Sequence, residues 1–154
     1  MDLQIAYSER LDGFATELVK IQDNIPICAA IISQRLAVYA LEEGSGWITE
    51  RVKSLVKNRD IVKEALEPLG KENVKGGEGA IYLWAKLPEG HRDDFKVVRW
   101  LAHRHGVVVI PGCASGSPGY LRVSFGGLQE VEMRAAAARL RKGIEELLHH
   151  GMVE

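Results

Sequence analysis

The first half of the chain repeats apolar positions at the spacing of α-helices. This spacing predicts helices at residues 8–20, 27–41 and 47–66. Ser8 is the expected N-cap of the first helix, because a serine side chain can accept a hydrogen bond from a free backbone N–H there. The segment 27–41 is apolar almost all round, so we expect it to contact protein on most of its sides.

Strand and helix patterns alternate in the second half. Residues typical of strands predict β-structure at 80–87, 107–110 and 120–125, and helical spacing returns at 93–105 and 129–149. The order is therefore helices followed by β-α-β-β-α. That order predicts a small α+β layer, with helices packed on one face of a sheet.

The helix expected at 93–105 has recognisable ends. Asp93 or Asp94 lies at its start, where a carboxylate complements the helix dipole. Gly106 follows as the expected C-cap, since glycine adopts a left-handed conformation without steric cost. Helical spacing places Phe95 among the inward-facing residues.

Composition narrows the class of protein. The 154 residues are 46% apolar and 27% charged, which is typical of a soluble globular protein. The 20 basic and 21 acidic residues give a net charge of −1, so nothing predicts binding to nucleic acid or to an anionic membrane. No apolar run approaches the roughly 20 residues of a membrane span, and no signal peptide is recognised. The distant Cys28 and Cys113 predict reduced thiols in a cytoplasmic protein.

Most of the residues that suggest chemistry have a simpler interpretation. His103 and His105 lie two apart on a helix, point to different faces and lack further ligands, so no metal site is expected. The glycine-rich loop 112–119 has no Gly-Lys-Ser/Thr sequence and precedes a strand, which argues against a phosphate-binding loop. Neither Ser115 nor Ser117 lies in a Gly-x-Ser-x-Gly turn, so no hydrolase nucleophile is predicted.

Arg122 is the most informative polar residue. Strand alternation places two sets of side chains on opposite faces: Leu121, Val123 and Phe125 on one, Tyr120, Arg122 and Ser124 on the other. The planar guanidinium of arginine suits bidentate binding of a carboxylate, and a strand would hold it rigidly. From the strand pattern alone, an arginine that simply points at solvent is the more common case.

The surroundings of Arg122 resemble a known family. From 107 to 125 a hydrophobic strand leads to Pro111-Gly112, a variable loop and then Arg122-Val123-Ser124. This order resembles a motif of the class I/II, fold type I, pyridoxal-5'-phosphate (PLP)-dependent aminotransferases. The segment 79–84 is similar to the first strand of that family's small domain, and 21–28 with Gln34 is similar to the region after its cofactor lysine. The plant members that use aromatic or methionine-type amino acids look most similar.

The resemblance implies a division of labour along the chain. Residues 1–44 would end the large PLP-binding domain, 45–69 would form the connecting helix, and 70–154 would be the C-terminal small domain. The parent activity would be PLP-dependent transfer of an amino group between an amino acid and a 2-oxo acid. Arg122 would bind the α-carboxylate of these substrates.

One departure from the family pattern concerns the cofactor. Ile5-Ala6-Tyr7 match the family, whereas residues 1–4 do not, and the position of the Schiff-base lysine falls ahead of Met1. We therefore expect a truncated protein with no catalytic or cofactor-binding residue of its own, inactive by itself and of doubtful PLP binding.

Two alternatives stay open at this point. In the first, the chain is a non-catalytic interaction module that associates with a full-length aminotransferase subunit through residues 27–41. In the second, it is a PLP-independent domain that binds carboxylates with Arg122. Without the rest of a large domain, the first helices are expected to expose an apolar patch, and the isolated chain is expected to aggregate or self-associate.

Overall fold

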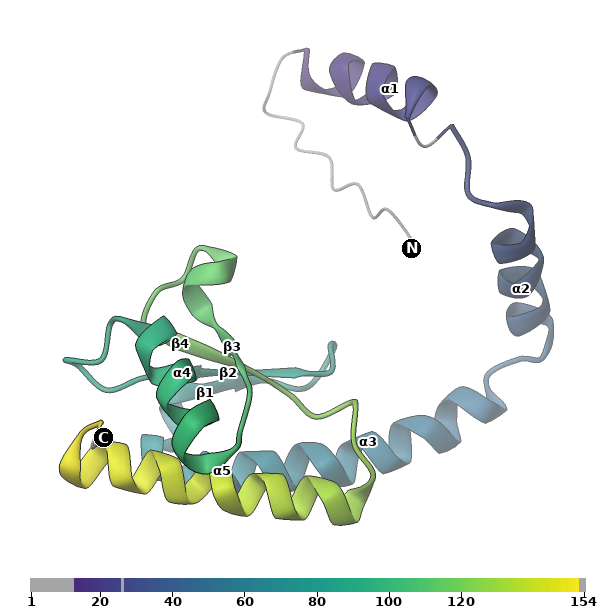
Figure 1. Ribbon diagram of the computed structural model, residues 1–154. Helices are drawn as coiled ribbons and strands as arrows, with labels where there is room; N and C mark the ends of the chain where they lie inside the picture. The colour runs from purple at the N-terminus through teal and green to yellow at the C-terminus, as the bar shows by residue number, and fades with distance from the viewer. Residues whose placement is uncertain (1–12, 26, 153–154) are drawn as a thin grey trace. The chain divides into compact units, whose positions relative to one another are not determined.

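The computed structural model describes residues 13–25 and 27–152. The chain forms two compact units, residues 1–47 and residues 48–154. Among the described residues, the regular structure of the first unit is helical, whereas the second unit combines helices with a small sheet (Figure 1).

The first unit contains helices α1 (Phe14–Asn24) and α2 (Ile31–Glu42). The start expected at Ser8 and the family-like residues 5–7 lie outside the described residues. Helix α2 begins later than the sequence predicts, because Ile27 has a left-handed φ of 51° and so cannot be part of a right-handed helix. A β-branched residue rarely adopts this conformation. No residue of α2 is buried within the described structure, although contact on most sides was expected.

Helix α3 (Gly46–Ala65) begins at the boundary between the units and is buried only in its second half, at Asn58, Val62 and Ala65. Helix α5 (Glu130–His150) starts with a capping box. The Glu132 side chain accepts the N–H of Gln129 at 3.2 Å, and the Gln129 side chain caps the helix in return. These two long helices run side by side beneath the sheet (Figure 1), where Arg141 on α5 donates to the Glu64 carbonyl at 2.9 Å.

Helix α4 (Asp94–His105) has the ends that its sequence predicts. The Asp93 carboxylate accepts the Lys96 N–H at 3.2 Å as the N-cap, and Gly106 closes the helix in the left-handed region. The inward position expected for Phe95 is wrong, since its side chain is 55% exposed. The buried face instead follows the spacing of the residues Asp94, Val97, Val98, Leu101 and His105.

A four-stranded antiparallel sheet forms the other layer of the second unit. Its strands, in spatial order, are β1 (Val74–Gly76), β2 (Tyr82–Lys86), β4 (Tyr120–Ser124) and β3 (Ile110–Pro111). Arg122 is central in the register, because it lies opposite Trp84 on β2 and opposite Ile110 on β3.

Two parts of the sheet differ from the sequence prediction. β1 was not expected, because its three residues end in Gly76, with a φ of 95°, and carry no strand pattern of their own. Of the strand expected at 107–110, only Ile110 pairs. Val107 and Val109 are buried, but Val108 is 82% exposed, so this stretch is an extended segment that joins the sheet at its last residue.

Three short 3-10 helices connect these elements: η1 (Glu67–Leu69), η2 (Lys71–Asn73) and η3 (Gly112–Ser115). Pro68 lies in η1, directly after α3, and cannot continue an α-helix. η3 forms the first half of the glycine-rich loop.

The core lies between the helices and one face of the sheet. Strand residues Leu83, Ala85, Leu121 and Val123 are buried there together with Val97, Leu101, Ile144 and Leu147 from α4 and α5. The expected α+β architecture, with helices on one sheet face, is confirmed. In the described part of the chain no helix is both long and apolar enough to cross a membrane.

Candidate functional site

The predicted alternation along β4 is confirmed. Leu121, Val123 and Phe125 are at most 5% exposed and point into the core. Arg122 lies on the opposite face, where its side chain is half-buried. The strand backbone therefore fixes the direction in which the guanidinium leaves the sheet.

An aromatic ring from the neighbouring strand β2 contacts this arginine. The guanidinium carbon of Arg122 lies 4.8 Å from the centre of the Tyr82 ring, within the range of a cation–π interaction. Trp84, opposite Arg122 in the register, stacks on Tyr120 with ring centres 5.8 Å apart and planes inclined by 20°. A cation–π contact with the face of a ring uses none of the guanidinium N–H groups as hydrogen-bond donors to an oxygen.

The polar capacity of Arg122 is unused within the described structure. Its Nε is buried and has no hydrogen-bond partner. No carboxylate of the described residues forms an ion pair with it. A buried N–H without a partner costs free energy, which an anionic acceptor from outside would recover. The arrangement is chemically suited to bind a carboxylate.

A small cavity of about 250 Å³ lies beside Arg122 at the β3 edge of the sheet. Apart from Tyr82, Arg122 and Ser124, its lining consists of apolar residues from 107–110, β4, α5 and their neighbours. The apolar lining limits competition from water and would strengthen a charge-assisted hydrogen bond to the guanidinium.

Several N–H groups in and beside the glycine-rich loop are bound within the chain. The Asp94 carboxylate, 1% exposed, accepts the N–H of Cys113 at 3.0 Å, of Gly119 at 2.8 Å and of Tyr120 at 3.4 Å. Burial raises the pKa of Asp94, but hydrogen bonds from Cys113, Gly119 and Tyr120 outweigh it and hold the pKa below its usual value. The loop binds a carboxylate of its own chain.

Asp94 was missed by sequence reasoning, which treated it only as one of two acids at the start of a helix. One signal was present in the sequence. Asp94 shares helical spacing with Val97, Val98 and Leu101, so a carboxylate lies on the apolar face, where it needs hydrogen-bond donors. Its neighbour Asp93 lies on the exposed face and caps the helix instead.

The remaining candidates do not form a site. His103 is exposed while His105 is buried, with Nε2 3.3 Å from Glu146. Among the described residues no three His, Cys, Asp or Glu side chains gather as metal ligands would. A hydrogen bond to Asp94 raises the pKa of the exposed Cys113 thiol, which makes it a poor nucleophile at neutral pH.

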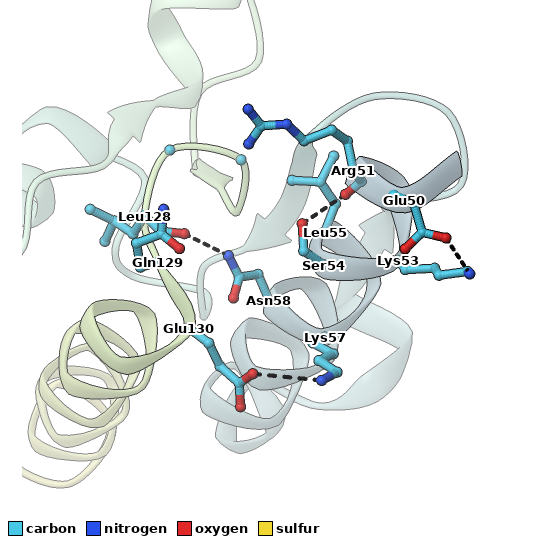
Figure 2. A pocket seen from close by; sticks show the side chains of 12 residues that line it. Glu50, Arg51, Lys53, Ser54, Leu55, Lys57, Asn58, Leu128, Gln129 and Glu130 are labelled. Carbon is cyan, nitrogen blue, oxygen red and sulfur yellow. Dashed lines mark hydrogen bonds and ion pairs between the residues drawn. The ribbon is translucent and has the colours of Figure 1, made fainter. Parts of the chain in front are cut away.

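A larger cavity, about 680 Å³, lies between α3 and the loop that leads into α5. Figure 2 shows Asn58 directed at the Leu128 carbonyl, to which it donates at 2.8 Å, and Lys57 directed at Glu130, 3.9 Å away. A hydrogen bond from Arg134 lowers the pKa of Glu130. The charges at this opening are largely satisfied within the chain, and Arg122 does not line it.

Comparison with known proteins gives the family. The model of the family "aminotransferase class I and II" matches residues 14–140. An LL-diaminopimelate aminotransferase from Maridesulfovibrio salexigens is 33% identical over 127 residues, which cover 81% of this chain and 32% of that protein. An aspartate aminotransferase from Thermotoga maritima is 30% identical over 122 residues, covering 79% and 30%.

The fold agrees with a solved structure of the same class. The α-aminoadipate aminotransferase from Thermus thermophilus is 22% identical, with a TM-score of 0.66 over 87% of this chain and 36% of that one. The chain thus spans about a third of the length of the curated relatives that it matches. Similarity to the plant aromatic- or methionine-using branch stays a prediction. The chain belongs to the class I and II aminotransferase family.

Proposed function

We propose that this chain supplies the substrate α-carboxylate site of a PLP-dependent aminotransferase, and that Arg122 forms this site. One observation carries the proposal: Arg122 is fixed on a strand against the Tyr82 ring, with a buried Nε that has no partner in the described structure. Family membership supports the reaction class, which is amino-group transfer between an amino acid and a 2-oxo acid.

The chemical contribution of Arg122 is to bind and orient. Two parallel N–H donors of the guanidinium match the two oxygens of a carboxylate, so a bidentate pair fixes the direction as well as the position of the substrate. Holding the carboxylate at β4 would hold the adjacent α-carbon at one place above the sheet. Such positioning is a large part of the rate enhancement in reactions of bound substrates.

The residues around Arg122 do not fit PLP. The cofactor needs a lysine amine for covalent attachment, yet among the described residues no lysine lines the cavity beside Arg122. The described lysines with ion pairs are exposed on helices, as Lys20, Lys53 and Lys96 illustrate. We assign the cofactor to no residue of this chain and derive no step through it.

The division of the chain follows from the same proposal. Residues 1–44 would belong to the end of a large domain, 45–69 to a connecting helix and 70–154 to the small domain that bears Arg122. We also propose a cytoplasmic location, which the two cysteines predict.

The test is a binding measurement with pyruvate, and with pyruvamide as the control that lacks the carboxylate. We expect pyruvate to bind with a dissociation constant on the order of 1 mM, or about −4 kcal/mol. Loss of charge-assisted hydrogen bonds costs about 1.5–3 kcal/mol, so Arg122→Met should weaken binding about tenfold or more. Arg139→Met, at an exposed position of α5, should leave it unchanged.

The outcome against the proposal is equal binding of pyruvate and pyruvamide, or unchanged binding by Arg122→Met. The assay contains no PLP, so binding alone also fits a PLP-independent carboxylate-binding domain. Adding PLP and an amino donor separates the two ideas. If a longer polypeptide that contains this chain transfers amino groups and loses that activity with Arg122→Met, the aminotransferase role stands.

A second candidate is an interaction module, favoured by the surface of α2. Ile32, Leu36 and Leu41 are 63–81% exposed, which leaves a large apolar surface on one helix. This surface would associate with an aminotransferase subunit or, in the isolated chain, with a second copy. Sedimentation at micromolar concentration should show self-association that Leu36→Lys reduces. A monodisperse wild-type monomer would contradict this candidate.

A further inference from the structure

Asp94 connects both ends of the glycine-rich loop to helix α4. A single oxygen, Oδ2, lies 3.0 Å from the N of Cys113, at the start of the loop, and 2.8 Å from the N of Gly119, at its end. The N of Tyr120, the first residue of β4, lies 3.4 Å from the same oxygen. We call these three hydrogen bonds the Asp94 latch.

The latch lies at the base of the strand that carries Arg122. Tyr120 and Arg122 are on the same face of β4, separated by one residue. The Gly119 carbonyl accepts the N–H of Leu87 at 2.9 Å, which ties the same point of the loop to the end of β2. The position at which β4 enters the sheet therefore depends on contacts that converge at Gly119 and Tyr120.

The loop turns tightly and depends on its glycines. A Cβ added to Gly112 would lie 2.2 Å from the Ser117 carbonyl oxygen, and Gly116 and Gly119 have φ of 74° and 84°. Glycines lose the most conformational freedom when a chain folds. Three hydrogen bonds to a charged acceptor offset part of that entropy, since bonds to ionised groups are about twice as strong as neutral ones.

The charge of Asp94 persists at neutral pH. The hydrogen bonds from Cys113, Gly119 and Tyr120 favour the ionised form and lower the pKa of Asp94 in spite of its burial. No cation of the described residues pairs with this carboxylate, so the latch is its whole set of partners apart from the Cys113 thiol. Its hydrogen bonds therefore reach the glycine-rich loop and the first residue of β4.

We propose that Asp94 is a positioning residue for Arg122: the Asp94 latch fixes where β4 begins and so sets the approach of the Arg122 guanidinium to a substrate carboxylate. This inference rests on the proposed function, because it needs Arg122 to bind a carboxylate. Asp94 itself touches no substrate.

The variant that tests it is Asp94→Asn, which keeps the shape of the side chain and removes its charge. Asp93→Asn is the matched control, because it removes the same charge one residue earlier, at an exposed position outside the latch. Pyruvate titrations of the isotope-labelled chain by NMR give the dissociation constant, and the Nε–H signal of Arg122 reports its environment. A role limited to stability would leave that signal unchanged in the folded protein.

We expect Asp94→Asn to weaken pyruvate binding about fivefold and to shift the Arg122 Nε–H signal, with both unchanged in Asp93→Asn. Coupling is reciprocal, so saturating pyruvate must slow amide hydrogen exchange at Cys113 and Gly119 in the wild-type chain by a similar factor. This second measurement needs no variant, and decides the question if Asp94→Asn fails to fold.

Unchanged affinity in folded Asp94→Asn, or unchanged exchange at Cys113 and Gly119 with pyruvate bound, overturns the inference. If Arg122→Met abolishes pyruvate binding while Asp94→Asn does not alter it, only this inference fails. If the wild-type chain binds pyruvate no better than pyruvamide, the proposed function is wrong, and this inference, which depends on it, is wrong as well.

Discussion

Gly143 on α5 offers a test of how tightly α4 and α5 are packed. Replacement by alanine adds one methyl group at the contact between the two helices. In a helix interior glycine is about 0.8–1.0 kcal/mol less favourable than alanine, so propensity alone predicts a more stable protein. The structure predicts the opposite sign.

The reason is the space around Gly143. A Cβ there would lie 2.6 Å from Leu101 Cδ2 and 3.0 Å from His105 Cδ2. Leu101 is fully buried, and the His105 ring contacts Trp100 edge-to-face at 4.9 Å and Glu146 at 3.3 Å, so neither can turn away cheaply. Overpacking of this kind costs about 1–3 kcal/mol, which exceeds the propensity gain.

We therefore expect Gly143→Ala to lower the free energy of unfolding by about 1 kcal/mol, which corresponds to a fall in Tm of about 2–4 °C for a chain of this length. Urea unfolding followed by tryptophan fluorescence measures it. Ala138→Gly, at an exposed position of the same helix, isolates the propensity effect and should cost about 1 kcal/mol. In a Leu101→Val background, which lacks the δ carbons, the penalty of Gly143→Ala should shrink. A Gly143→Ala protein that is more stable than wild type would refute this reasoning.

Two further predictions concern the site. Tyr82→Leu removes the ring against which Arg122 lies, and should weaken pyruvate binding by about 1 kcal/mol, or roughly fivefold, whereas Tyr82→Phe retains the ring and the affinity; equal loss in both variants would show that the hydroxyl, not the ring, matters. The folded-state pKa of Asp94 is lowered, so its stabilising effect is present above the ordinary carboxyl pKa and is lost as pH falls through the lowered value. The difference in unfolding free energy between wild type and Asp94→Asn should accordingly be constant near pH 7 and shrink in acid, and a constant difference down to pH 2 would contradict this assignment.

The local pattern of apolar and polar residues was sufficient to predict the long helices and the face of the sheet on which Arg122 lies. Alternation along 120–125 separated Arg122 from Leu121 and Val123 correctly, because side-chain direction in a strand depends only on the pleat. The caps of α4 at Asp93 and Gly106 were predictable for the same reason, since capping involves residues only a few positions apart.

Misassigned positions depended on distant parts of the chain. β1 exists because Val74–Gly76 meets β2, and only Ile110 of the stretch 107–110 reaches β4. Phe95 was expected to face the core, but the face of α4 that packs against the core carries Asp94, and Phe95 is exposed. The pairing of β1 and of Ile110 depends on which segments meet in space, and no short-range pattern encodes that.

By itself, therefore, the sequence determined the helices, the face of Arg122 and, through the motif around it, the family. Only the tertiary structure decided what surrounds that arginine. Asp94 acquires its role from N–H groups 19, 25 and 26 residues further along the chain, and Arg122 meets Tyr82 only because β2 and β4 pair. The physical reason is that hydrophobic periodicity records local backbone geometry, whereas a buried charge depends on partners that folding brings from elsewhere.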